Sequence, residues 1–564
     1  MNPITTDAQR LPQDVLQLFG AALASAIASR FPDAPTAEIA FEAPRRPEFG
    51  DFSTNAAFSL ARIAKRSPQD VAAMLIDDLA GHHPHLQTAF AQITATAGFI
   101  NLRLAPAAWQ AALAQMLTDG TNFGQAAPNG TRISLEFGSA NPTGPLVVVQ
   151  GRTLSIGATL ASAMRFCGYD VFTEWISNDA GSQLETLGAS LYARYRQLVD
   201  PAHPFPENGY PGDYLLPIAA QIAAADGELW CERPQSEWMP HFSTVGKDAL
   251  IADQRKTVER FGVTFDLWQS EKQLHDDGRL AAGLQHLADT GTTYRKDGAL
   301  FFRATQFGDD KDRVLVRADG RPTYLAPDVA YHYDKLKRSD RVIDILGPDH
   351  HGYIGRLQGL AEALGYKGHL EVLIAQQITL MRSSEQVAMS KRAGHIVTLD
   401  EIIDEVGVDA ARFFFVMLAP ESPLTFDLAL AKTKTHDNPV YYVQYGHARI
   451  ASVFKNAGPD DTAIASAATA VSLRGLTNPA ELALIRRLAE LPKAAANAVE
   501  HLAPHRLTRY ARDVAADFHQ FYTECKILTE DRELRIARLA LASATKNILA
   551  QVLALVGVSA PDAM

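Results

Sequence analysis

The stretch Arg132-Ile-Ser-Leu-Glu-Phe137 and the segment that follows it decide the fold class. The apolar residues Ile133, Leu135 and Phe137, which include β-branched and aromatic ones, alternate with polar residues, which predicts a strand. The loop Gly138-Ser-Ala-Asn-Pro-Thr-Gly-Pro145 is rich in turn formers and leads into a helical pattern from about Gln150 to Cys167. A second strand pattern runs from Tyr169 to Ile176. Together the segments predict a βαβ unit, the building block of a parallel sheet.

Strand patterns continue along the chain and are interleaved with helical ones. We expect strands at Ala299 to Arg303, Arg341 to Leu346 and Glu371 to Ile378. They extend the βαβ unit to an α/β fold with a Rossmann-like, doubly wound parallel sheet.

The order of the patterns predicts four parts in this chain of 564 residues. An N-terminal α+β domain covers residues 1–112, and the Rossmann-like domain covers 129–390 with an insertion at about 184–295. A short segment at 391–430 leads to an all-helical domain at 431–564, in which Ala457 to Ser472 is predicted to be a loop.

The composition narrows the class of protein. Apolar residues make up 47% of the chain and charged residues 21%, the balance of an ordinary globular protein. The chain has no run of ~18 uncharged apolar residues, so we expect no membrane partner. Cys167, Cys231 and Cys525 lie far apart and form no CxxC pair, which favours a reducing, cytoplasmic setting.

The charge is unevenly distributed. The net charge is −11, but residues 431–564 carry 16 Lys and Arg against 13 Asp and Glu. A mildly basic end on an acidic body is compatible with an RNA contact at that end. An ordinary solvated helical surface explains the charge equally well.

Two loops carry residue types that suit phosphate groups. The turn at Asn141-Pro-Thr-Gly-Pro145 precedes a helix, whose N-terminus at the carboxyl edge of a sheet favours anions and nucleotides. The run Ala388-Met-Ser-Lys-Arg-Ala-Gly394 can hold phosphate oxygens by charge-assisted hydrogen bonds. Either loop alone is compatible with a structural turn, but the pair indicates a nucleotide site.

These loops belong to a set of segments that resembles the class I aminoacyl-tRNA synthetases, and among them the bacterial type of arginyl-tRNA synthetase. The resemblance covers nearly the whole chain, in family order. Its segments are Phe49-Gly50-Asp51, Gly98-Phe-Ile-Asn-Leu102, Glu136 to Leu146, Ile176-Ser-Asn-Asp-Ala-Gly181, Asp309-Asp-Lys-Asp-Arg313, Tyr324-Leu-Ala-Pro-Asp328, Gly347-Pro-Asp-His-His-Gly352, Met389-Ser-Lys-Arg-Ala-Gly394 and Asn438-Pro-Val-Tyr-Tyr-Val-Gln-Tyr445.

The resemblance implies a cytoplasmic, monomeric arginine–tRNA ligase that joins arginine to tRNA(Arg) through an arginyl-adenylate. It implies that residues 1–112 are an additional, tRNA-contacting domain and that 129–390 are the catalytic domain. It also implies a stem-contact segment at 391–430 and an anticodon-binding domain at 431–564. ATP enters as its Mg²⁺ complex, and no protein-bound metal is expected, although His350 and His351 after Asp349 could also be read as ligands. The residues implied for arginine are Glu136, Asn141, Tyr324 and Asp328. Those implied for ATP are Gly144, Val147, Val149, His350, Met389 and Lys391. The implied catalytic residues are Lys391, Ser390 and Gln150, and the implied tRNA contacts are Asn438, Tyr441 and Tyr445.

The sequence departs from the family pattern at the nucleotide site. Where the family carries a His-x-Gly-His tetrad, this chain has Val147-Val-Val-Gln150, and Ala388 replaces a lysine of the second loop. A valine side chain cannot donate a hydrogen bond, and a glutamine donates only a neutral one. Two interpretations follow. The chain is either a ligase with impaired adenylation, or a catalytically weak or inactive paralogue that binds arginine, tRNA or both.

Overall fold

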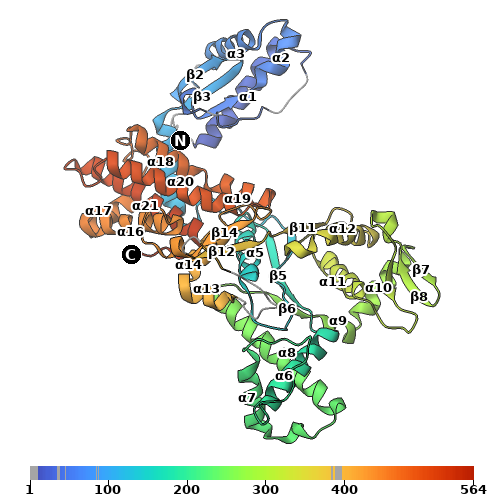
Figure 1. The fold of residues 1–564 in the computed structure, drawn as a ribbon. Coiled ribbons are helices and arrows are strands. Elements are labelled where there is room, and N and C mark those ends of the chain that lie inside the picture. The colour runs from blue at the N-terminus through green and yellow to red at the C-terminus, as the bar shows by residue number, and fades with distance from the viewer. Residues whose placement is uncertain are drawn as a thin grey trace.

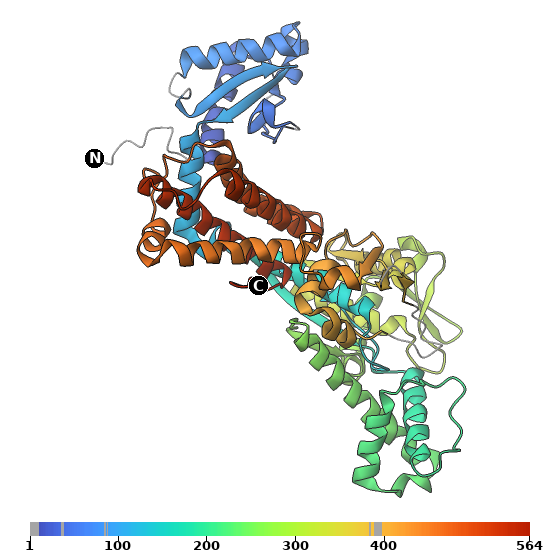
Figure 2. The ribbon, with the colours of Figure 1, turned by 60° about the vertical axis from the view of Figure 1, so that its left-hand side comes forward.

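The computed structural model describes residues 11–34, 39–44, 46–83, 86, 88–382, 385–387 and 397–564. The molecule is elongated (Figures 1 and 2). The N-terminal domain lies at one end and the helical bundle lies beside it. The catalytic sheet follows, and the helical insertion α6–α8 forms the opposite end.

The catalytic sheet has five parallel strands in the order β11-β10-β4-β5-β6. Its strands are β4 (Arg132–Phe137), β5 (Asp170–Ser177), β6 (Leu267–Ser270), β10 (Arg341–Leu346) and β11 (Leu370–Ile374). The chain runs outward from β4 in one direction and then returns to its other side at β10. The strand order therefore reverses between β4 and β10, and ligands of doubly wound sheets bind at this point. The predicted fold class is confirmed.

Helix α5 (Val148–Phe166) follows β4 and packs closely against it. A Cβ atom at Gly157 would lie 2.0 Å from the Phe137 ring, so only glycine permits this approach. The contact fixes the helix N-terminus at the carboxyl edge of the sheet.

Two of the predicted strands differ from the structure. The segment predicted at Ala299–Arg303 forms β8 (Ala299–Phe302), which pairs with neighbouring strands in a separate antiparallel sheet. Its partners are β7 (Thr293–Lys296) and β9 (Arg313–Val316). Short connections make such local pairing favourable, and alternation alone does not specify the partner strand.

The segment predicted at Glu371–Ile378 is divided between two sheets. Strand β11 ends at Ile374, and β12 (Ile378–Arg382) pairs with β14 (Leu424–Asp427) and β13 (Glu385–Gln386). The buried Arg152 guanidinium donates hydrogen bonds to the carbonyl oxygens of Gln376 (2.7 Å) and Gln377 (3.5 Å). The Gln377 carbonyl also accepts from Leu424 N at 3.0 Å, at the start of the pairing between β12 and β14.

The range 184–295, predicted as an insertion, contains a helical unit with its own core and also strand β6 of the catalytic sheet. Its helices are α6 (Ser182–Gln197), α7 (Leu215–Asp226), α8 (Gln235–Arg260), α9 (Glu271–Asp276) and α10 (Arg279–Asp289). The next helices in the chain are α11 (Leu325–Arg338), α12 (Ile354–Ala363), α13 (Leu399–Val406), α14 (Val408–Phe415) and α15 (Leu428–Lys432).

The N-terminal domain packs three helices on a small sheet of order β1-β3-β2. Its elements are α1 (Pro12–Arg30), β1 (Phe52–Thr54), α2 (Ala56–Ala64), α3 (Pro68–His82), β2 (Phe90–Thr96) and β3 (Phe99–Leu104). Helix α4 (Pro106–Asp119) leads into the C-terminal bundle, where Gln110 donates to the carbonyl oxygens of Arg474 (3.4 Å) and Leu476 (3.1 Å).

The C-terminal bundle contains six helices in its described residues. They are α16 (Pro439–Ala457), α17 (Pro459–Ser466), α18 (Pro479–Ala489), α19 (Leu491–Glu500), α20 (His505–Glu524) and α21 (Arg532–Val556). Helix α17 replaces part of the loop predicted at Ala457–Ser472, because Pro459 at its first turn is compatible with a helix start. Helix α21 is long and apolar enough to span a membrane, but 61% of its apolar window is buried, as in a core helix.

Candidate active site

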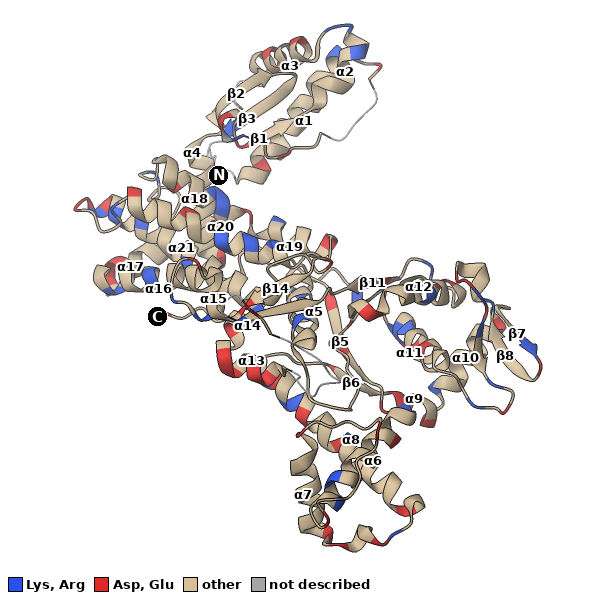
Figure 3. Cartoon of the chain, viewed as in Figure 1, with Lys and Arg blue, Asp and Glu red and all other residues tan. Residues whose placement is uncertain are grey.

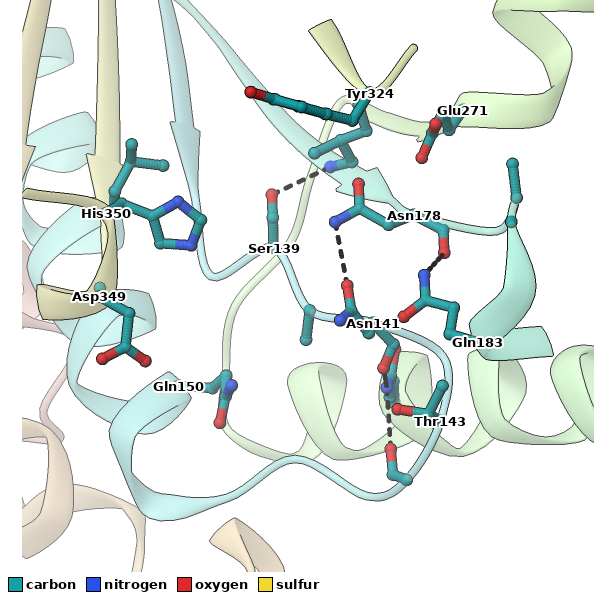
Figure 4. Close-up of a pocket in the computed structure, with 18 of the residues that line it drawn as sticks. Ser139, Asn141, Thr143, Gln150, Asn178, Gln183, Glu271, Tyr324, Asp349 and His350 are labelled. Carbon is teal, nitrogen blue, oxygen red and sulfur yellow. Dashed lines mark hydrogen bonds between the residues drawn. The ribbon is translucent and has the colours of Figure 1, made fainter. Parts of the chain in front are cut away.

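A large cleft opens at the carboxyl edge of the catalytic sheet, where the strand order reverses. Its volume is about 1620 Å³. The loops after β4, β5, β6 and β10 form its walls, together with residues 205–214 of the insertion. The close-up in Figure 4 shows side chains from these loops turned toward a common space. A cleft at this position has the size and place expected for a nucleotide and a second substrate.

The cleft brings most of the sequence-predicted site residues together. Those that line it are Glu136, Asn141, Gly144, Val147, Val149, Gln150, Tyr324, Asp328 and His350. Met389, Ser390 and Lys391 lie outside the described residues. The chain that follows them is bonded to the start of α5, because Leu399 N donates to Leu146 O (2.8 Å) and Val148 N donates to Val397 O (3.4 Å).

Glu136 shares a buried cation, Lys335, with Asp344. Its carboxylate accepts hydrogen bonds from Lys335 Nζ at 2.7 Å and from Ser139 Oγ at 2.9 Å. Lys335 is fully buried and also donates to Asp344 at 2.6 Å. The negative charge of Glu136 is therefore already partly compensated before any ligand arrives.

Two partly buried carboxylates in the cleft, Asp328 and Glu271, have no direct partner among the described residues. Within the described part of the chain, the side chains of Asp328 and Glu271 have neither a hydrogen-bond partner nor an ion pair, and both line the cleft. Burial raises the pKa of Asp328 to about 6. Burial and then the negative charge of Asp328 raise the pKa of Glu271 to about 7. Such a pair favours a cation that can face both groups.

Glu271 was not among the residues predicted from the sequence. It is the first residue of α9 and directly follows β6, the strand that was missed. An acidic residue after a short strand would have been a candidate had β6 been recognised, since parallel strands end at the same edge. Tyr324 stands just before α11 and is 62% exposed, with its ring on the cleft side (Figure 4).

The altered tetrad forms the N-terminus of α5. Val147 is the capping residue, and its side chain makes no capping hydrogen bond. The Gln150 side chain accepts a hydrogen bond from Val147 N at 3.2 Å, so its carbonyl oxygen caps the helix. Val147 and Val149 contribute apolar surface to the cleft. One helix-terminal N–H that could hold an anion is therefore occupied. The two valine side chains offer no donor, and Gln150 offers only its neutral amide nitrogen.

His350 lies in the turn Pro348–Tyr353, and its imidazole points into the cleft (Figure 4). His351 is exposed and is not part of the cleft lining. Among the residues that the structure describes, no three His, Cys, Asp or Glu side chains are grouped so as to hold a metal ion.

An aromatic and basic face lies on the C-terminal bundle. The rings of Tyr441 and Tyr445 stack at 5.9 Å between centroids. The Arg449 guanidinium lies 4.7 Å from the Tyr445 ring centre and donates to its hydroxyl at 2.8 Å. Arg506, Arg509 and Arg512 are exposed and follow one another every three residues along α20. Figure 3 shows basic residues on this helix. Stacked rings beside arginines are suited to single-stranded RNA.

Asn438 does not belong to this exposed face. It is 3% exposed, and its side chain caps α16 by accepting from Val440 N at 3.2 Å. Its amide nitrogen donates to the carbonyl oxygens of Ala431 (3.0 Å) and Thr433 (2.8 Å). These hydrogen bonds occupy the Asn438 side chain, and its direct contact with tRNA stays a prediction. Asn followed by Pro is a helix-start signal that the sequence already contained.

The protein combines a doubly wound parallel sheet, an acidic pocket at the carboxyl edge of that sheet, and a C-terminal helical bundle with an aromatic face. This combination defines its class, the class I aminoacyl-tRNA synthetases. Residues 240–415 match the family described as tRNA synthetases class I (R), catalytic domain. Residues 15–104 match the arginyl tRNA synthetase N terminal domain, and residues 443–564 match the DALR anticodon binding domain. The catalytic match begins after the altered tetrad.

Comparisons that span nearly the whole chain show which family of this class the protein belongs to. The arginine–tRNA ligase of Desulfosudis oleivorans is 43% identical over 541 residues, which cover 95% of this chain and 96% of that protein. That of Moorella thermoacetica is 44% identical over 534 residues, covering 93% and 94%. The arginyl-tRNA synthetase structure from Thermus thermophilus shares the fold, with a TM-score of 0.74, 21% identity, and coverage of 97% of this chain and 100% of that chain. The chain belongs to the arginine–tRNA ligase family.

Proposed function

We propose that this chain is an arginine–tRNA ligase whose adenylation step is impaired. Arginine and ATP, supplied as its Mg²⁺ complex, would react in the cleft to give arginyl-adenylate and pyrophosphate. The arginyl group would then pass to the 3′ end of tRNA(Arg), with release of AMP. We further propose that the protein acts as a monomer in the cytoplasm. The observation that carries the impairment is the apolar, self-capped N-terminus of α5.

The amino-acid end of the cleft supports arginine as the substrate. Asp328 and Glu271 are unpaired carboxylates, and a planar guanidinium can donate hydrogen bonds to both. Such a site rejects a neutral analogue by ~10⁴-fold, because buried acceptors would be left without their partners. Since Glu136 is already paired with Lys335, we assign Glu136, Asn141 and Tyr324 to other parts of the amino acid.

The nucleotide end of the cleft lacks the donors that this chemistry needs. The arginine carboxylate attacks the α-phosphate of ATP, and negative charge must be stabilised there and on the departing pyrophosphate. Gln150 can offer only the amide nitrogen, because its oxygen caps α5. We propose Gly144, Val147, Val149, His350 and Met389 as ATP contacts, and Ser390 and Lys391 as contacts to the reacting phosphates.

Val149 adds a second fault of a different kind. In the family pattern its position is a glycine, on which the adenine base lies flat. A β-branched side chain on the cleft wall leaves less room for the base, which would weaken ATP binding before any reaction. The missing imidazoles would instead lower the rate of the chemical step.

We propose that the bundle holds tRNA through Tyr441 and Tyr445, assisted by Arg449 and the exposed arginines of α20. The stacked rings of Tyr441 and Tyr445, with the Arg449 guanidinium over the Tyr445 ring, support this assignment. Phosphate contacts by the arginines would make the affinity depend on salt.

The proposal is tested by arginine-dependent exchange of pyrophosphate into ATP, with and without tRNA. We expect a rate at least ~10³-fold below that of a relative with an intact tetrad, since one missing donor commonly costs ~10²–10³-fold. Arginine binding measured by calorimetry should nevertheless be normal. Exchange that is absent under every condition, with arginine and tRNA binding retained, would favour the inactive paralogue. A rate equal to that of the relative would refute the impairment.

A further inference from the structure

The turn after β5 contacts the segment that carries Glu271, the residue of the proposed arginine pocket that directly follows β6. Strands β5 and β6 are parallel neighbours with Ser177 opposite Ser270, so they end side by side. Asp179 lies two residues beyond β5, and Glu271 directly follows β6. The Asp179 carboxylate accepts from Ser270 Oγ at 2.9 and 2.8 Å and from Lys272 N at 3.0 Å. It therefore bonds to the residue on each side of Glu271.

These bonds fix a segment that has little stability of its own. Helix α9 has only six residues, and a helix of that length is marginal without tertiary contacts. Ser270 already caps it by accepting from Gln273 N at 3.1 Å. Asp179 holds this capping hydroxyl in turn, and so sets the direction in which the first residue of α9 leaves the strand.

Asp179 is itself held in place. It is 5% exposed, and the preceding residue, Asn178, is tied on both sides. Gln183 donates to Asn178 O at 2.7 Å, and Asn178 donates to the Asn141 side chain at 2.9 Å (Figure 4). The turn is thereby fixed to the loop after β4, on the opposite wall of the pocket.

We propose that Asp179 is a positioning residue of the amino-acid pocket, which acts by holding Glu271 toward the guanidinium beside Asp328. A folding role alone explains Asp179 poorly, because Ser270 suffices as a cap and a buried carboxylate adds like charge to an acidic site. That repulsion is relieved only when a cation enters the pocket. The inference rests on the proposed function, because it takes Glu271 as an arginine contact.

The acidic groups also predict a signature in the pH profile. The ionisable groups that act on Glu271 are Asp328 on α11 and Asp179 after β5, and both favour its protonated form. Removal of the Asp179 charge should therefore move the pH midpoint of arginine binding downward. Because this charge acts on Glu271 whether or not Asp179 positions it, the positioning role itself is tested by the coupling between the two residues.

The test is a double-mutant cycle on the full chain, read by calorimetry with arginine between pH 5.5 and 8.5. Asp179→Asn should weaken arginine binding about tenfold, the size of one charge-assisted hydrogen bond, and lower the pH midpoint. In a Glu271→Gln background the same substitution should change the affinity less than about twofold, because coupled residues are not additive. Asp276→Asn, on the exposed side of α9, is the matched control and should bind as the parent does.

The outcomes separate the inference from the proposed function. Parental affinity in Asp179→Asn, or an undiminished effect in the Glu271→Gln background, overturns the positioning role and leaves the pocket intact. If neither Glu271→Gln nor Asp328→Asn weakens binding, the arginine pocket itself is wrong, and the inference falls with it. Should Asp179→Asn fail to fold, Ser270→Ala removes the same hydrogen bond from the other side and must show the same non-additivity with Glu271→Gln.

Discussion

Lys335 and Glu136 form a buried ion pair, with the ammonium nitrogen 2.7 Å from a carboxylate oxygen. The two residues are 199 positions apart in the chain, and they join α11 to the end of β4. Asp344 and His332 extend the cluster, because His332 Nε2 lies 2.9 Å from the Asp344 carboxylate. In the proposed function, recognition of the guanidinium is therefore assigned to the carboxylates without a partner, Asp328 and Glu271.

Removal of the Lys335 charge should destabilise the whole catalytic domain. Lys335→Met leaves Glu136 and Asp344 buried without their cation, and breaking a buried pair in this way costs ~3–5 kcal/mol. Denaturant unfolding should show a loss of that size. Glu136→Gln in the same chain should recover part of it, and a full loss in the double variant would contradict the pairing.

Arginine binding should depend on Asp328. Asp328→Ala removes one carboxylate from the pair that faces the guanidinium, and we expect the affinity to fall ten- to a hundredfold, the size of one charge-assisted hydrogen bond. Calorimetry with arginine measures the effect. Asp334→Ala, on the same helix but outside the cleft lining, serves as the control. Indifference to Asp328→Ala would refute the pocket assignment.

Arginine affinity should rise with pH between about 5.5 and 8. The free protein holds protons on Asp328 and Glu271, whose pKa values are raised to about 6 and about 7, and the guanidinium binds the ionised pair. The two protons displaced make the expected rise on the order of 10- to 100-fold.

The same pKa shifts bear on stability. A carboxyl group whose folded-state pKa is raised stabilises the fold below its unfolded pKa, and this contribution is lost as pH rises through the folded value. For Asp328 and Glu271 the loss falls between about pH 4 and about pH 7. The increase in melting temperature caused by arginine should therefore be larger at pH 8 than at pH 5. An arginine effect that is equal at both values would contradict the proposed charge states.

Binding of tRNA should weaken with salt, and the arginines of α20 should account for part of the dependence. Substitution of Arg506, Arg509 and Arg512 by Gln should reduce the slope of log affinity against log salt by about 2, at ~0.7–0.9 for each phosphate that is no longer neutralised. Filter binding across a salt series measures the slope. Arg233→Gln and Lys256→Gln, on the insertion, should leave it unchanged. An unaltered slope in the triple variant would exclude α20 from the interface.

The sequence predicted the parts of the fold that depend on local pattern. Strand β4 and helix α5 carry long, regular patterns, and the structure has them close to the predicted bounds. Strand β6 has only four residues and lies within a mostly helical range, so no periodicity distinguished it. Strand β8 was recognised, but its sheet was wrong, because alternation specifies an element and not its partner.

In the site too, residues that lie in sequence motifs were predicted, whereas residues that enter the site only through tertiary contacts were not. Residues within motifs, such as Asn141 and Asp328, were found and line the cleft. Glu271 stands in no motif, and its role depends on a strand pairing that only the fold creates. The Lys335–Glu136 pair was invisible for the same reason, since nothing in the sequence relates two residues so far apart. Asn438 also lies in a motif, and the structure shows that its side chain caps α16, a role that the match to the family motif alone did not indicate.

Repair of the tetrad separates its two faults. Val149→Gly alone should improve ATP binding with little gain in kcat, because it removes a ground-state obstruction. Val147→His with Gln150→His should raise kcat only when the glycine is also restored. Ala388→Lys should add a smaller gain. If one histidine alone restored kcat while Val149 was still present, the expected order of effects would be contradicted.

The most direct measurement is the rate of arginine-dependent pyrophosphate exchange, with tRNA present, in the unmodified chain and in the variant with Val147→His, Val149→Gly and Gln150→His. If the altered N-terminus of α5 limits adenylation, the repaired chain should exchange faster by ~10³-fold or more, because it regains preorganised donors at the reacting phosphate. Equal rates in the two chains, both at the level of an intact arginine–tRNA ligase, would show that Val147-Val-Val-Gln150 does not impair the enzyme.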